Sequence, residues 1–324
     1  MILVCFGTRP EFIKINPLIE KFKEHDVEYK LCFTGQHETL LQEVDVDQRI
    51  TIKDSNKNRL DDIISSVMNG IDFTGVKYVL VQGDTATAYG IALSAFHHQV
   101  KIVHLEAGMR THDITSPYPE EFYRQCISKI ADVNLVPSGV EQHHLITEGA
   151  RNIFIVGNTI NDNLVNVETE YGNKVLVTLH RRENHDKIRD FFVEINDLAK
   201  EHPELEFVLP IHPNPNVICH KDILTHVNVT DPLPYDELLN LLASCRMCIT
   251  DSGGIQEEAS FLGKRLIVCR DKTERVSLID NFKLCPKPND LKEMFESMIN
   301  NYEVDRNFAY GRGNACEKIV RILK

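Results

Sequence analysis

The sequence predicts an α/β protein with two doubly wound, mostly parallel β-sheets, each in its own domain. Short, unbroken apolar runs alternate with helical patterns almost to the end of the chain. Strands covered by helices on both faces have such unbroken runs, whereas half-exposed strands alternate apolar and polar residues. Strand–helix alternation with short turns indicates right-handed crossovers and therefore a parallel sheet. The pattern starts twice, with a polar stretch at 158–172 between the two series, and this predicts two domains.

The first series predicts a sheet whose strands are connected by helices. The strands are expected at 2–6, 29–34, 77–82, 101–105, 133–136 and 153–156. The helices are expected at about 10–24, 59–69, 86–97, 120–131 and 139–148.

The second series predicts a similar unit and a short final helix. Its strands are expected at 174–180, 206–211, 226–230, 247–250 and 265–269. The expected domains are 1–160 and 172–305, with 306–324 as a C-terminal helical segment. Two α/β domains joined by a polar linker imply a cleft between them.

The composition limits the partners and the compartment. The chain has 324 residues and a formal net charge of -12. Nucleic acid requires a basic face, so the charge argues against that partner, whereas a small anion needs only a local basic site. No apolar run approaches the roughly 18 residues that a membrane span requires. The scattered cysteines and the absence of a signal-peptide pattern at the N-terminus are typical of a cytoplasmic protein.

Carboxylates follow two expected strands of the first series. Asp84 comes after the strand at 77–82, and Glu106 comes after the strand at 101–105. Ligands of open α/β sheets bind at the carboxyl ends of the strands, so these positions favour a site. Glu120 begins the next helix, and Arg124 lies one turn later. The alternative is that loops of an acidic protein simply contain acids.

A glycine-rich turn in the second series predicts an anion site. Ser252, Gly253 and Gly254 connect an apolar strand directly to a helix. Glycines let a ligand approach the backbone, and the helix N-terminus favours negative charge. Glu258 lies one turn inside the helix and could accept hydrogen bonds from ribose hydroxyls. The alternative is a tight turn with a capping serine. No Walker or Gly-x-Gly-x-x-Gly pattern is present, so no dinucleotide cofactor is indicated.

Basic residues lie at other expected strand ends. Arg9 and Lys14 belong to the first turns of a helix that follows the strand at 2–6, and ordinary capping with solvated charges would also explain them. His180 ends the first strand of the second series, and a solvated basic turn would also explain it. His212 follows the next strand, where the neighbouring prolines could simply shape a loop. No spacing of His, Cys and carboxylates predicts a metal site.

Together these positions predict a particular chemistry. A phosphate-binding turn and basic strand ends in one domain, with carboxylates in the other, suit cleavage of a bond to a phosphorylated leaving group. The carboxylates would move protons on the organic part of the substrate.

The sequence resembles the non-hydrolysing UDP-N-acetylglucosamine 2-epimerase family over nearly its whole length. The matching segments are GTRPEFIK (7–14), GQH (35–37), VQGDTAT (81–87), HLEAGMRT (104–111), SPYPEE (116–121), GNT (157–159), TLHRREN (178–184), PIHPNPNV (210–217), TDSGGIQEEA (250–259) and TERV (273–276). Their order along the chain makes the combination specific.

The resemblance implies a fold, an assembly and a reaction. The fold would be two Rossmann-like domains in the arrangement of GT-B glycosyltransferases, with the last helix crossing back to the first domain. The protein would be a cytoplasmic homodimer that acts on a UDP-sugar and requires neither metal nor cofactor. The reaction would invert C2 of a UDP-2-acetamido sugar through elimination of UDP, a bound 2-acetamidoglycal and re-addition of UDP.

The resemblance also implies residue roles by position. Asp84, Glu106 and Glu120 would be the acid and base groups with Arg124 supporting them, and His180 would stabilise the departing pyrophosphate. The residues expected to bind the substrate are Arg9, Lys14, His212, Leu238, Ser252, Gly253, Gly254, Glu258 and Arg275. Glu121 has no implied role, and its charge at a helix N-terminus is a sufficient explanation.

The sequence departs from the family pattern in its length and at individual positions, among them Val276-Ser277, where the family has Pro-Glu, and Leu233, which replaces a glutamine. It is about fifty residues shorter than typical members. Glu38-Thr39 follows GQH where bacterial members carry the residues of a substrate-activation site, and Leu238 replaces an aromatic expected near uracil.

Alternative functions within the same fold are a 2-epimerase for another UDP-2-acetamido sugar, such as a deoxy sugar or a diacetamido uronic acid, a hydrolysing epimerase, and a GT-B glycosyltransferase. A catalytically silent UDP-sugar-binding module is the alternative outside enzymes. The complete set of Asp84, Glu106, Glu120 and His180 favours the epimerase.

Overall fold

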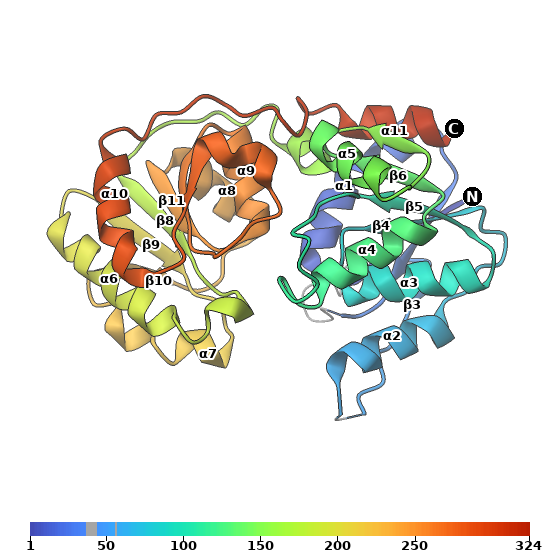
Figure 1. Ribbon diagram of the computed structural model, residues 1–324, viewed down its shortest axis with the longest axis horizontal. Helices are drawn as coiled ribbons and strands as arrows, with labels where there is room; N and C mark the ends of the chain where they lie inside the picture. The colour runs from blue at the N-terminus through green and yellow to red at the C-terminus, as the bar shows by residue number, and fades with distance from the viewer. Residues whose placement is uncertain (37–43, 56) are drawn as a thin grey trace. The chain divides into compact units, whose positions relative to one another are not determined.

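The computed structural model describes residues 1–36, 44–55 and 57–324 (Figure 1). The chain forms two compact units, Met1–Val165 with Ala309–Lys324, and Asn166–Phe308. Each contains one parallel sheet with helices around it, so the predicted class of two parallel-sheet α/β domains is confirmed.

The sheet of the first unit has the strand order β3-β2-β1-β4-β5-β6-β7. Its strands are β1 (Ile2–Phe6), β2 (Tyr29–Phe33), β3 (Gln48–Arg49), β4 (Tyr78–Gln82), β5 (Lys101–Leu105), β6 (Val133–Val136) and β7 (Ile153–Ile155). The strand order reverses direction between β1 and β4, which is the switch point where doubly wound sheets bind ligands. The two-residue strand β3 was not predicted because it has no apolar run.

Helices cover both faces of this sheet. They are α1 (Arg9–Glu24), α2 (Arg59–Gly70), α3 (Ala86–His97), α4 (Glu120–Ile130), α5 (Gly139–Thr147) and α11 (Ala315–Leu323). Alternate residues of a strand point to opposite faces. Val4 and Phe6 of β1 therefore pack in one core with α1 and α11, whereas Leu3 and Cys5 pack in another core with α2 and α3. This two-sided burial explains the unbroken apolar run at the N-terminus.

The final helix belongs to the first unit. Helix α11 packs against α1, as Figure 1 shows in red and blue. The carboxylate of Asp162 accepts hydrogen bonds from the backbone N–H groups of Ala315 and Cys316, both at 3.0 Å, and so caps α11.

The second unit has the strand order β10-β9-β8-β11-β12-β13. Its strands are β8 (Lys174–Thr178), β9 (Glu206–Pro210), β10 (Asn228–Thr230), β11 (Met247–Thr250), β12 (Arg265–Val268) and β13 (Phe282–Leu284), of which β13 was not predicted. Its helices are α6 (Ile188–Glu201), α7 (Pro215–Ile218), α8 (Tyr235–Ser244), α9 (Gly253–Phe261) and α10 (Leu291–Ile299). The switch point lies between β8 and β11.

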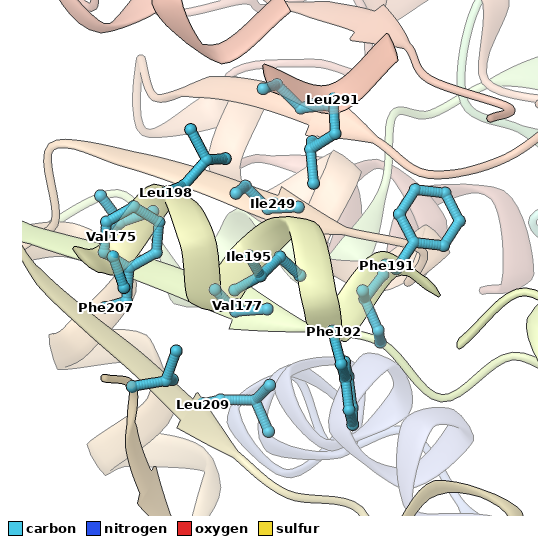
Figure 2. Close-up of a cluster of buried hydrophobic side chains, with 14 of the residues drawn as sticks. Val175, Val177, Phe191, Phe192, Ile195, Leu198, Phe207, Leu209, Ile249 and Leu291 are labelled. Atoms are coloured by element: carbon cyan, nitrogen blue, oxygen red, sulfur yellow. The ribbon is translucent and has the colours of Figure 1, made fainter. Parts of the chain in front are cut away.

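One apolar core supports the central strands of this unit. Figure 2 shows Phe191, Ile195 and Leu198 of α6 packed against Val177 of β8 and Ile249 of β11. This packing fixes the strand ends that carry the candidate site residues. Within the part of the chain that the structure describes, no helix is both long and apolar enough to span a membrane.

Candidate functional site

Two parallel neighbours, β4 and β5, bring Asp84 and Glu106 to the same edge of the first sheet. Gln82 of β4 pairs with Leu105 of β5, so the residues that follow both strands emerge together. The turn before Asp84 is fixed by Gly83, whose N–H donates to the carbonyl of Leu105 at 2.9 Å. Gly83 has a φ of 68°, a left-handed conformation that glycine adopts without a steric cost.

The imidazole of His104 stabilises the same turn through a hydrogen bond to the Gly83 carbonyl. Its Nε2 lies 2.8 Å from the carbonyl oxygen of Gly83, and the ring is fully buried. Burial lowers the pKa of His104 from 6.5 to about 4, so the ring is neutral near pH 7. A neutral ring must carry its proton on Nε2 to donate this bond.

Glu106 is held in an unusual backbone conformation. Its φ is 63°, which is uncommon for a residue other than glycine and is typical of functional sites. Its carboxylate accepts an ion-paired hydrogen bond from Lys14 Nζ and a 2.7 Å hydrogen bond from Gln82 Nε2. The Lys14 and Glu106 side chains are 9% and 10% exposed. The carboxylate therefore sits in a fixed, mostly buried setting.

Asp84 is paired with Arg124 of α4. The Arg124 side chain is 5% exposed, whereas that of Asp84 is 28% exposed. Glu120 is the first residue of α4 and is half-buried. The structure thus brings Asp84 and Arg124 together and places Glu120 one helical turn before Arg124.

The turn around Arg9 differs from the predicted anion site. Both backbone donors, Gly7 N and Thr8 N, bind the carboxylate of Glu11 at 2.8 and 2.7 Å. The Thr8 and Thr85 hydroxyls also donate to Glu11. The capping alternative is therefore correct for the backbone of this turn. Lys14, in contrast, is buried rather than solvated.

In the second unit, the buried carboxylate of Asp251 organises the end of β8. It accepts hydrogen bonds from His180 N, Arg181 N and Asn184 Nδ2 at 2.9–3.1 Å. Residue 251 itself follows β11, so one side chain ties together the two strands at the switch point. The His180 ring stacks on His212, with ring centroids 5.0 Å apart and planes 11° apart. Burial lowers the pKa of His180, and the nearby charge of Asp251 opposes that effect.

The N-terminus of α9 is open to a ligand. Ser252 occupies the capping position but its side chain makes no capping hydrogen bond. The first N–H groups of a helix have no acceptor within the helix, so these donors point outward. A Cβ added to Gly254 would meet nothing closer than the Ser252 hydroxyl at 4.0 Å.

Arg275 is fixed directly beside this turn. Its Nε donates to Glu257 at 2.7 Å, and its guanidinium also pairs with Glu274. A Cβ added to Gly253 would lie 2.5 Å from the guanidinium carbon, so only glycine allows the contact. The turn therefore combines backbone donors with a positioned positive charge.

Glu258 lies one turn further along α9 and is 6% exposed. The Tyr235 hydroxyl donates to its Oε1 at 2.8 Å. Burial and the charge of Glu258 raise the pKa of Tyr235, so the hydroxyl keeps its proton. Leu238 lies on the same helix as Tyr235 and is half-buried.

Several residues of these networks were not predicted as site residues. Direct contacts to predicted residues are made by Gln82, Glu121, Asp251 and Tyr235, whereas Glu11 caps the helix that begins at Arg9. Thr8 and Glu11 match the Thr-x-x-Glu pattern of a capping box, which the sequence already contained. His37 and Glu38-Thr39 lie outside the described residues, so the departure there stays a prediction. No cluster of three or more metal-binding side chains occurs among the described residues.

Comparisons with known proteins identify relatives along the whole chain. A family model described as UDP-N-acetylglucosamine 2-epimerase matches residues 20–324. The chain is 35% identical to a UDP-N-acetylglucosamine 2-epimerase of Campylobacter jejuni, over 99% of this chain and 97% of the relative. It is 33% identical to a UDP-N-acetylglucosamine 2-epimerase of Bacillus subtilis, over 99% of this chain and 94% of that protein.

Solved structures agree with this assignment. UDP-GlcNAc 2-epimerase from Neisseria meningitidis, solved bound to UDP-GlcNAc, matches with a TM-score of 0.91 and 30% identity over 99% of each chain. S. aureus MnaA, solved with UDP, matches with a TM-score of 0.88 and 30% identity, over 100% of this chain and 95% of that one. These likenesses confirm the predicted GT-B-like class. MurG of Acinetobacter baumannii, at 11% identity and a TM-score of 0.58, supports the fold alone.

Proposed function

Because the chain belongs to the UDP-N-acetylglucosamine 2-epimerase family and is therefore an epimerase, we propose that it interconverts UDP-N-acetylglucosamine and UDP-N-acetylmannosamine. The observation that carries this proposal is the pair of carboxylates at neighbouring strand ends. Asp84 and Glu106 emerge side by side from β4 and β5, and each is held by a cation whose side chain is less than 10% exposed. Such fixed carboxylates suit proton transfer at a sugar carbon.

The proposed reaction proceeds by elimination and re-addition. A base takes the proton from C2 while the bond between C1 and the UDP oxygen breaks, which gives UDP and a 2-acetamidoglycal. In the second half, the UDP oxygen bonds again to C1 and an acid returns a proton to C2 from the opposite face. Inversion needs proton transfer on both faces of C2, and Asp84, Glu106 and Glu120 are the proposed acid and base groups.

We propose that the second unit binds the nucleotide. The N–H groups of Gly253 and Gly254 and the hydroxyl of Ser252 would bind the pyrophosphate, with Arg275 as the counter-charge. The ring of His180, whose backbone N–H is held by the Asp251 carboxylate, would stabilise the departing UDP. His212 would support the His180 ring through their stacking.

The remaining proposed contacts concern the rest of UDP and the first unit. Glu258, which accepts a 2.8 Å hydrogen bond from the Tyr235 hydroxyl, would also accept hydrogen bonds from the ribose. Leu238 would provide an apolar surface near uracil. Arg9 would contribute charge from the start of α1, and Lys14 would act through Glu106.

Other substrates remain alternatives. The family membership and the site fit any UDP-2-acetamido sugar, because the proposed chemistry uses only C1, C2 and the UDP leaving group. Incubation with a panel of UDP-2-acetamido sugars would rank them. Release of free N-acetylmannosamine instead of its UDP derivative would support the hydrolysing alternative.

The decisive test is hydrogen exchange at C2. Incubation with UDP-N-acetylglucosamine in deuterated water should place deuterium at C2 and produce UDP-N-acetylmannosamine. Asp84→Asn and Glu106→Gln should each lower turnover by about 10²-fold or more, because each removes a proton-transfer group. UDP affinity should be retained, because the proposed nucleotide site lies in the other unit. Near-normal turnover in both variants would contradict the assigned roles.

We also propose that the protein is a cytoplasmic homodimer. Phe96 of α3 and Phe122 of α4 are 54% and 44% exposed, and Phe122 lies 6.1 Å from the partly buried Tyr89 of α3, measured between ring centroids. These aromatic rings give neighbouring helices an apolar surface that association could cover. Light scattering should give twice the 37.1 kDa mass of the chain. A mass of one chain at micromolar concentration would contradict the dimer.

A further inference from the structure

Glu121 is a fully buried carboxylate, which a helix N-terminal charge does not explain. Its side chain is 0% exposed. A carboxylate in the interior must be compensated by hydrogen bonds or by a positive charge. Glu121 accepts hydrogen bonds from Thr111 N at 3.0 Å, His112 N at 3.1 Å and Gln125 Nε2 at 2.8 Å, and it pairs with Arg124 at 3.3 Å.

Arg124 is shared between two carboxylates of different exposure. Its Nη1 faces the buried Glu121, and its Nη2 faces Asp84, which is 28% exposed. The guanidinium group is planar and presents its donors in a fixed geometry, so binding at one edge orients the other edge. The buried Glu121 thus fixes the position at which the Arg124 guanidinium contacts the Asp84 carboxylate.

The same carboxylate also fixes the loop that follows Glu106. His112, whose N–H donates to Glu121, has a φ of 59°, a left-handed conformation that a residue other than glycine seldom adopts. The Glu121 carboxylate accepts from two successive N–H groups of this loop and so stabilises its unusual path. The Glu121 side chain thus connects this loop to the first turn of α4 by hydrogen bonds.

We infer that Glu121 is a positioning residue, whose buried carboxylate fixes Arg124 and thereby the carboxylate of Asp84. This inference rests on the proposed function, because it assigns a purpose to the orientation of Asp84. Glu120, the neighbouring residue, is half-buried and is proposed to act on the substrate itself.

The inference can be tested with a double-mutant cycle of Glu121→Gln and Arg124→Ala. Glu121→Gln should lower kcat for C2 exchange by about 10- to 100-fold, because small displacements of reacting groups have effects of that size. The Kd for UDP should not change. The double variant should be no more than about threefold slower than Arg124→Ala alone, because both changes remove the same orientation of Asp84. If the fold-losses in kcat of the two single variants multiply in the double variant, the inference is overturned.

Gln125→Ala is the matched control. It removes another hydrogen bond to the same carboxylate and leaves Arg124 in place, so kcat should stay within about threefold of the wild type. Because Glu121→Gln disturbs several buried donors, Glu121→Asp provides a second variant that keeps the charge but withdraws it by one methylene group. It should also lower kcat, and its effect should also disappear in the Arg124→Ala background. A persistent effect would overturn the inference.

A reagent for arginine separates this inference from the proposed function. Phenylglyoxal should modify Arg124 faster in Glu121→Gln than in the wild type and in Gln125→Ala, as mass spectrometry of peptides would show. Unchanged reactivity would overturn the inference even if the wild type is active. If the wild type exchanges no hydrogen at C2 but Arg124 becomes reactive in the variant, the proposed function is wrong and the positioning of Arg124 is supported.

Discussion

The switch points of the two sheets have the same topology but are occupied differently. In the first unit, α1 and α3 are both capped by their own side chains, Thr8 and Thr85, and Glu11 binds both threonine hydroxyls. In the second unit, α9 begins at Ser252 without a side-chain cap. The first switch point is filled by the protein itself, and the second has donors available for an anion. One fold thus supports two kinds of site.

The largest loss of stability should come from Glu11→Gln, because this change removes the carboxylate that fills the first switch point. The Glu11 carboxylate accepts from Gly7 N, Thr8 N and two hydroxyls, and an amide cannot accept all of these bonds. The buried donors left without a partner should lower the free energy of unfolding by about 3 kcal/mol. Urea denaturation would measure this.

Glu20→Gln provides the control for that variant. Glu20 lies on the same helix, and its side chain is 55% exposed beside Lys23. This change should have little effect on stability, since exposed ion pairs contribute little. Equal losses in both variants would contradict the view that Glu11 fills the first switch point.

A smaller effect should appear in the pH dependence of stability. His104 stays neutral in the folded protein down to a pKa of about 4, whereas its ordinary value is 6.5. Below pH 6.5 the unfolded chain gains a proton that the folded protein does not, so this group lowers stability as the pH falls from 6.5 towards 4. The loss should be roughly 2 kcal/mol at pH 5 relative to pH 7.

His104→Gln tests the origin of this loss. Glutamine can donate to the Gly83 carbonyl but does not titrate, so the variant should lose less stability between pH 7 and pH 5 than the wild type. Urea midpoints at both pH values would give the difference. Identical pH dependence in both proteins would show that His104 is not responsible.

The smallest effects should come from the capping residues, compared as a pair. Thr8→Ala should lower the free energy of unfolding by about 1 kcal/mol, because it removes a helix cap. Ser252→Ala should leave stability nearly unchanged, because its hydroxyl caps nothing, and should weaken UDP binding by roughly fivefold through one lost hydrogen bond. Calorimetry of UDP binding and thermal denaturation would check both variants. A clear stability loss in Ser252→Ala would remove the proposed difference between the switch points.

The positions of the strand-end residues could be predicted, because unbroken apolar runs locate buried strands and the next residues must lie at the sheet edge. Asp84 and Glu106 were found in this way. The capping box at Thr8 and Glu11 is also a local pattern in the sequence, because its two residues are three positions apart.

Other features depend on contacts between distant segments. The burial of Glu121 depends on a loop that folds back to donate from Thr111 and His112, and nothing in the helix pattern of α4 encodes that. Asp251 gains its partners from the turn after β8, about 70 residues earlier in the chain. The spacing of apolar residues predicts which face of a segment is buried. It does not predict which distant segment packs against that face.

The position of α11 has a consequence for synthesis on the ribosome. Cys316, Ile319 and Val320 complete the apolar core on one face of the first sheet, but they are translated after the whole of the second unit. At about 5 to 20 residues per second, residues 166–308 take roughly 7 to 30 s to synthesise. During that time this face of the nascent first unit lacks α11, so its final folding step must follow translation of the second unit.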